Sequence, residues 1–151
     1  MNMQHQVFEK APDFRAERNA LARWLREHRW DHFATATYRY PVSPEGARYH
    51  VRSLLRRIEQ RAQSGIAAFW VSEYGRGGTY HTHLLIADDG RLASAHIRAA
   101  WKRTGIIEVV PYDPSLSGAE YVCKFLLAPD QDHDWNIHGL HFAHRLAEVP
   151  Q

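Results

Sequence analysis

The chain has 151 residues, of which 44% are hydrophobic, and a net charge of +2 at neutral pH. This size suits one buried core, so we expect a single domain over residues 1–151. With no apolar run of membrane-spanning length and no signal peptide, the sequence is typical of a soluble, cytoplasmic protein without a membrane partner. The single cysteine, Cys123, excludes an internal disulfide and a cysteine-based zinc site, while the slightly basic balance permits nucleic acid as a partner.

The first part of the chain predicts a helix, a strand and a second helix. Apolar side chains recur at helical spacing over residues 15–29. Residues 30–40, WDHFATATYRY, alternate in polarity and are rich in aromatic and threonine side chains, which favours a strand. A helix over residues 44–63 follows, with Ser43 as its N-cap and Pro44 at its first position.

The second part predicts a hairpin and then further helices and strands. A glycine-rich turn separates two apolar runs, which is typical of two antiparallel strands. Proline and glycine punctuate the segments that follow. The predicted elements are strands 66–74 and 80–87, helix 94–104, strand 106–112, helix 117–127 and an edge strand within 135–145.

This order of elements predicts an α+β fold. An antiparallel sheet with helices packed on one face, in the ferredoxin-like or RRM-like manner, satisfies it. The other face of such a sheet is free for a ligand. Within the single domain we expect an N-terminal helix, a core over residues 31–127 that carries the motifs, and a tail over 128–151.

Glu73, His81 and His83 are the candidate metal ligands. The two histidines lie two residues apart in a strand, so their side chains share one face with roots roughly 6.6 Å apart. A hairpin would fold Glu73 back beside them. Two imidazoles and a carboxylate leave positions open on a divalent ion, and with a phosphate substrate Mg²⁺ or Mn²⁺ fits best, although Zn²⁺ is compatible. Among 11 histidines, the same pair could instead line a partly exposed strand face.

Tyr121 and Lys124 are the candidate catalytic pair. They are neighbours on the surface of the last predicted helix. A free tyrosine has a pKa near about 10, so it attacks phosphorus only if its phenolate is favoured, as a metal cation and a lysine would do. In an isolated amphipathic helix the same two residues are usually a packed ring and a solvated charge.

Three arginines are candidates for contact with DNA phosphates. Arg52 and Arg56 are neighbours on the helix over residues 44–63, where a solvated helix face is the alternative that we favour. Arg76 lies in the glycine-rich turn, where the loop would place it beside the metal.

Taken in order, these motifs resemble those of the HUH endonucleases, specifically the rolling-circle replication initiators, or Rep proteins. The resemblance covers most of residues 31–127. The middle residue of the histidine motif is Thr82 here, where the family has a hydrophobic residue. The matching segments are FxTxT at Phe33, Thr35 and Thr37, the glutamate, turn and HxH strand from Glu73 to His83, and YxxK from Tyr121 to Lys124.

The resemblance implies a specific chemistry. Such proteins nick single-stranded DNA, or an exposed strand of an origin hairpin, and Thr35 and Thr37 become candidate DNA contacts. The tyrosine attacks the scissile phosphate and stays bound to the 5′ end, and the free 3′-OH primes synthesis. A bound Mg²⁺ or Mn²⁺ polarises the phosphate. The sequence has no GxxxxGK[ST] motif, so we expect a separate helicase and polymerase.

Three alternatives remain open at this stage. A single-tyrosine HUH transposase shares the motifs, but its tyrosine helix usually has glutamine where this chain has Lys124. A non-catalytic RRM-like nucleic-acid binder would stack bases on exposed aromatics, for which Phe69, Trp70 and Tyr74 are available. A metal-dependent hydrolase would use water in place of Tyr121.

Overall fold

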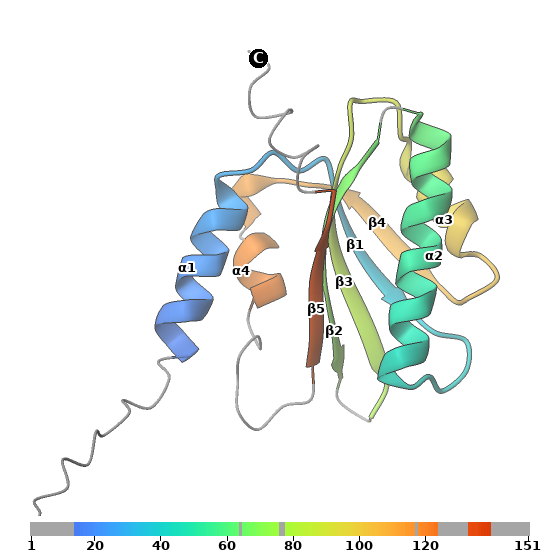
Figure 1. The fold of residues 1–151 in the computed structure, drawn as a ribbon, viewed down its shortest axis with the longest axis horizontal. Helices are drawn as coiled ribbons and strands as arrows, with labels where there is room; N and C mark the ends of the chain where they lie inside the picture. Colours follow the sequence, from blue (N-terminus) through green and yellow to red (C-terminus); the bar gives the residue numbers. More distant parts are fainter. Residues whose placement is uncertain (1–13, 64, 76–77, 117, 124–132, 140–151) are drawn as a thin grey trace, which may run out of the picture.

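The computed structural model describes residues 14–63, 65–75, 78–116, 118–123 and 133–139. Within these ranges, the chain forms helices and strands in alternation around one sheet (Figure 1). No helix in the described part of the chain is long and apolar enough to cross a membrane. The elements are α1 (Phe14–Arg26), β1 (His32–Thr37), α2 (Pro44–Ala62), β2 (Ala67–Tyr74), β3 (Tyr80–Ala87), α3 (Ser94–Trp101), β4 (Ile107–Pro111), the 3₁₀ turn η1 (Pro114–Leu116), α4 (Gly118–Cys123) and β5 (His133–His138).

The sheet has five strands in the order β4-β1-β3-β2-β5, and every neighbouring pair is antiparallel. Strands β1 to β4 with α2 and α3 form a β-α-β-β-α-β unit, the ferredoxin-like arrangement. The predicted α+β class and antiparallel sheet are therefore confirmed. Strand β5 extends the sheet by pairing with β2.

Helices α2 and α3 cover one face of the sheet (Figure 1). Helix α2 begins as predicted, because Ser43 Oγ accepts a hydrogen bond from the Gly46 N–H at 3.1 Å. Its apolar stripe packs on the alternate strand positions that point towards it. The core of this layer includes Val51, Leu54, Leu55, Ile58, Trp70, Leu84, Ile86, Ile97 and Trp101.

Helices α1 and α4 lie on the other face, so the helices are not confined to one face as predicted (Figure 1). The reason lies in β2 and β3, whose residues are buried at consecutive positions rather than at alternate ones. Such strands need apolar cover on both faces. The second layer buries Ala22, Leu25, Phe69, Val71, Leu85, Ala119, Val122 and Cys123.

The edge strand of the tail lies earlier than predicted. We expected it within residues 135–145 because of the alternation in GLHFAHRL, and the structure forms it at His133–His138. Most of GLHFAHRL lies outside the described residues, as does the part of the predicted helix 117–127 that follows Cys123. Pairing along β2, from Ala68 to Glu73, determines where β5 lies.

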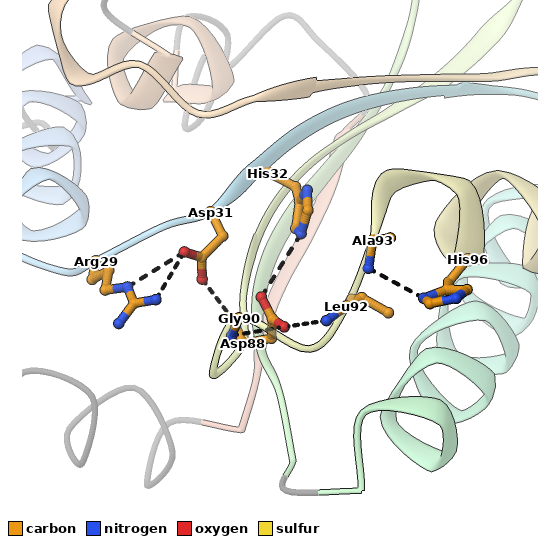
Figure 2. A network of polar contacts seen from close by, with 8 residues as sticks. All are labelled: Arg29, Asp31, His32, Asp88, Gly90, Leu92, Ala93 and His96. Atoms are coloured by element: carbon orange, nitrogen blue, oxygen red, sulfur yellow. Dashed lines mark hydrogen bonds and ion pairs between the residues drawn. The ribbon is translucent and has the colours of Figure 1, made fainter.

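A network of carboxylates fixes the end of the sheet where β1 begins and β3 ends (Figure 2). Asp31 Oδ2 accepts a hydrogen bond from the Asp88 N–H at 2.8 Å. Asp88 Oδ2 in turn accepts from the N–H groups of Gly90 at 3.1 Å and Leu92 at 2.6 Å. The buried Asp88 carboxylate therefore shapes the loop between β3 and α3.

Candidate active site

Strand register brings the motif side chains onto one face of the sheet. Glu73 on β2 is paired with His81 on β3, and Thr35 on β1 is paired with His83. Because side chains alternate along a strand, His81 and His83 both project to the face that α1 and α4 partly cover. Thr82, between them, projects to the opposite face.

His83 is held between two polar partners. Its Nε2 lies 3.3 Å from Glu73 Oε1, and both side chains are largely buried. Its Nδ1 lies 3.3 Å from Thr35 Oγ1. When Nδ1 carries the proton, Thr35 accepts it as a hydrogen bond, and the lone pair of Nε2 is left directed towards Glu73.

His81 lies against the turn that follows β2. A Cβ atom on Gly75 would be 2.5 Å from His81 Nε2, so only glycine leaves room for the ring in this orientation. Gly75 also donates a hydrogen bond from its N–H to Thr79 O at 2.7 Å. Within the described ranges, no three His, Cys, Asp or Glu side chains close on a common point. Glu73 and His83 converge, and His81 is turned away.

The donor set nevertheless fits a divalent cation. One carboxylate oxygen and two imidazole nitrogens project from neighbouring strands to the same face. The side chain of His81 needs to rotate from the turn towards Glu73 to complete the set. Three such donors would leave coordination positions open for a substrate oxygen.

Helix α4 carries Tyr121 to the same place. Ala119, Val122 and Cys123 on its inner side are buried against the sheet and α1. Tyr121, on the edge of the helix, keeps 50% of its surface exposed. Its ring meets the His83 ring at a centroid distance of 5.1 Å and an angle of 89°, and lies 6.0 Å from the Phe33 ring.

Comparison with protein families identifies this arrangement. The model of a family described as replication-associated protein, of the ORF2 type, matches residues 31–129, which include every strand from β1 to β4 and helix α4. The chain belongs to this family. It is a Rep-type member of the HUH superfamily, and a replication-initiator type of function follows from the family.

Other comparisons are more distant. One solved structure, the N-terminal nuclease domain of non-structural protein 1 of minute virus of mice, is 11% identical and covers 83% of this chain and 79% of that chain, with a TM-score of 0.30. Its title describes Zn²⁺ coordination in the active-site pocket and recognition of DNA at the origin of replication. No curated protein matches the sequence of this Rep-type chain.

The remaining candidate residues of this Rep-type chain fall in different places. Lys124 and Arg76 lie outside the described residues. Thr37 Oγ1 donates a hydrogen bond to Ile106 O at 3.2 Å. Arg52 and Arg56 lie on α2, across the sheet from His83, where they line a separate cavity of about 400 Å³. The structure thus does not bring these two arginines to the candidate active site.

One polar cluster beneath the site was not predicted. Thr82 Oγ1 lies 2.7 Å from both Ser72 Oγ and Tyr38 Oη, on the face opposite the histidines. Burial raises the pKa of Tyr38 to about 12, so this phenol stays protonated and can donate. The polar Thr82 in an otherwise apolar strand was the only sequence signal for the cluster.

Proposed function

We propose that this protein nicks single-stranded DNA in a metal-dependent, sequence-specific reaction and thereby initiates rolling-circle replication. Tyr121 is the nucleophile, and Glu73, His81 and His83 hold the divalent ion, Mg²⁺ or Mn²⁺. The observation that carries the proposal is the contact between Tyr121 and His83, because His83 is also within 3.3 Å of Glu73. A phenol, an imidazole and a carboxylate from three separate elements thus meet on one sheet face.

The covalent step follows from this placement. The Tyr121 oxygen forms a bond to the scissile phosphorus, and the bond from phosphorus to the 3′ oxygen breaks. The phenolic proton passes to water, which reaches the half-exposed ring, and the leaving 3′ oxygen takes up a proton to become a 3′-OH. The 5′ phosphate stays on Tyr121, and attack by a 3′-OH in the reverse direction transfers the strand and releases the tyrosine.

The roles of the other residues follow from their positions. The bound cation supplies charge stabilisation at the phosphate oxygens. Glu73 and His83 already converge to receive it, and Thr35 orients the imidazole of His83. Lys124, one helical turn after Tyr121, is the proposed partner that favours the phenolate.

Burial of the aromatic residues disfavours a non-catalytic RRM-like binder. Such a module stacks bases on exposed rings at the centre of its sheet. Phe69 and Trp70 are buried, and only Tyr74, at the end of β2, is exposed. The central positions of the partly covered face are instead occupied by Glu73, His81 and His83.

The test is an adduct assay. The full chain and its Tyr121→Phe variant are incubated with Mn²⁺ and a randomised pool of single-stranded DNA, and an SDS-resistant increase in protein mass is sought. Tyr49→Phe is the matched control, because Tyr49 is also exposed but lies on α2 across the sheet. We expect the adduct in the wild type and in Tyr49→Phe, and its loss in Tyr121→Phe and after addition of EDTA.

Two results would contradict the proposal. An adduct in Tyr121→Phe would show that another residue is the nucleophile. DNA cleavage by Tyr121→Phe without any adduct would show a hydrolase that uses water.

A further inference from the structure

A cavity of about 300 Å³ opens beside Tyr121, on the side away from the histidines. It lies between β1, β4, η1 and the start of α4. Thr35 and Tyr121 belong both to its wall and to the candidate active site. Whatever occupies the cavity is therefore next to the reacting phosphate.

The wall of the cavity is mostly apolar and aromatic. Phe33 and Tyr112 contribute rings, Gly118 lies against both of them, and Leu116 from η1 is 75% exposed. A Cβ atom on Gly118 would be 3.1 Å from the Tyr112 ring, so glycine at this position keeps the wall open. Flat faces and small side chains suit a planar ring.

Asp113 supplies the charge in this wall. Its Oδ1 accepts hydrogen bonds from Ser115 N at 2.9 Å and Ser115 Oγ at 2.7 Å. These two hydrogen bonds lower the pKa of Asp113, which is therefore ionised at neutral pH. Among the described residues, none donates a hydrogen bond to Oδ2, and no lysine, arginine or histidine is in the cavity wall.

From this cavity we infer a specificity pocket that holds the base of the nucleotide next to the scissile phosphate. The inference rests on the proposed function, since it takes single-stranded DNA as the substrate. A carboxylate without a cation beside it repels a phosphate, whereas base faces stack on aromatic side chains. The base enters the cavity, and its phosphate stays outside between Tyr121 and His83.

Asp113 also determines which bases fit. A carboxylate accepts hydrogen bonds from exocyclic amino groups, as on cytosine and adenine, whereas thymine presents no amino group. The pocket therefore prefers amino-bearing bases to thymine at this position. Asp113→Asn, which introduces a donor, reduces this preference.

The first experiment measures binding without chemistry. The four deoxynucleoside 5′-monophosphates are titrated into the metal-free full chain, and amide shifts are followed by NMR. We expect shifts at Val110, Leu116 and Gly118, with weaker binding of dTMP than of dCMP or dAMP. Leu116→Ala weakens dCMP binding by roughly fourfold, the scale of one buried methylene group. Ile106→Ala leaves it unchanged, because Ile106 is equally exposed, at 77%, but is outside the cavity.

The outcomes separate this inference from the nicking proposal. Absence of shifts at the cavity amides, or equal effects of Leu116→Ala and Ile106→Ala, would overturn the pocket even if the tyrosine adduct forms. Equal binding of the four monophosphates would overturn the role of Asp113. Shifts at the cavity in a protein that forms no adduct would support the pocket and contradict the nicking reaction alone.

Discussion

The Tyr121 ring meets the His83 ring edge-on, with centroids 5.1 Å apart and the ring planes at 89°. The two residues come from different layers of the fold, since Tyr121 is on α4 and His83 is in a central strand of the sheet. The apolar inner side of α4 anchors the helix, so the contact does not depend on a flexible loop. This geometry makes several properties of the site measurable.

The hydroxyl of Thr35 should support metal binding through His83. Thr35→Val keeps the shape of the side chain but removes the oxygen that lies 3.3 Å from His83 Nδ1. Loss of such an outer partner weakens metal affinity by about 10- to 100-fold. Calorimetric titration with Mn²⁺, in the absence of DNA, measures the change.

Two variants control this prediction. Thr35→Ser retains the hydroxyl and should bind Mn²⁺ nearly as the wild type does. Thr37→Val makes the same change on the same strand face, where the hydroxyl donates to Ile106 O instead of a histidine, and should leave the affinity unchanged. Equal losses in both valine variants would mean that the strand, not the hydroxyl, is responsible.

Gly75→Ala should strengthen metal binding. The new Cβ would lie 2.5 Å from His81 Nε2, so it excludes the orientation in which His81 lies against the turn. The ring is then displaced towards Glu73 and His83, and the fraction of molecules ready to bind rises. Because apparent affinity scales with that fraction, we expect a gain of about two- to tenfold in Mn²⁺ affinity by calorimetry.

The double variant Gly75→Ala with His81→Ala tests the cause of that gain. Without the imidazole at position 81, the alanine at position 75 should confer no gain over His81→Ala alone. Weaker Mn²⁺ binding in Gly75→Ala would contradict the idea that His81 must rotate away from the turn.

Thr82→Val should destabilise the fold although its shape is preserved. The valine would leave the hydroxyls of Ser72 and Tyr38 without the partner that lies 2.7 Å from each. A buried polar group left unpaired costs about 1–3 kcal/mol. Urea unfolding should show this loss, and the triple variant Thr82→Val, Ser72→Ala, Tyr38→Phe should recover part of it. A triple variant less stable than Thr82→Val would contradict this account.

Asp88 gives a pH dependence of stability with a definite sign. Burial, the largest cause, raises the pKa of Asp88 above its ordinary value, and the negative charge of Asp31 adds to it. The protonated carboxyl is therefore favoured in the folded state. Its contribution to stability is fully present below the unfolded pKa of about 3.9 and is lost as pH rises through the higher folded pKa.

Asp88→Asn removes this titration. The amide oxygen still accepts hydrogen bonds from the N–H groups of Gly90 and Leu92, and no buried charge remains. The stability of Asp88→Asn relative to the wild type should therefore rise as pH increases from about 3 to about 7. Asp88→Ala, which leaves both N–H groups without their acceptor, should be less stable than Asp88→Asn at every pH. A difference between Asp88→Asn and the wild type that does not change with pH would show that Asp88 has an ordinary pKa.

Local features of the sequence determined much of the fold. Alternation in β3 places His81 and His83 on one face and Thr82 on the other, whatever the rest of the chain does. Ser43 and Pro44 fix the start of α2 through the capping of its own first turn. These features depend on neighbours in the chain, and single-residue patterns contain that information.

Tertiary structure alone decided what each side chain meets. The sequence gives no reason why Thr35 should contact His83, why Gly75 should accommodate the His81 ring, or why Tyr121 should lie against His83. It also did not show that β2 and β3 need helices on both faces, or that Arg52 and Arg56 lie across the sheet from the site. These relationships arise from strand register and from the packing of α4, which join residues far apart in the chain. Chain-local periodicity determines which face a residue occupies, whereas the contacts across that face depend on how distant elements bury their apolar surfaces together.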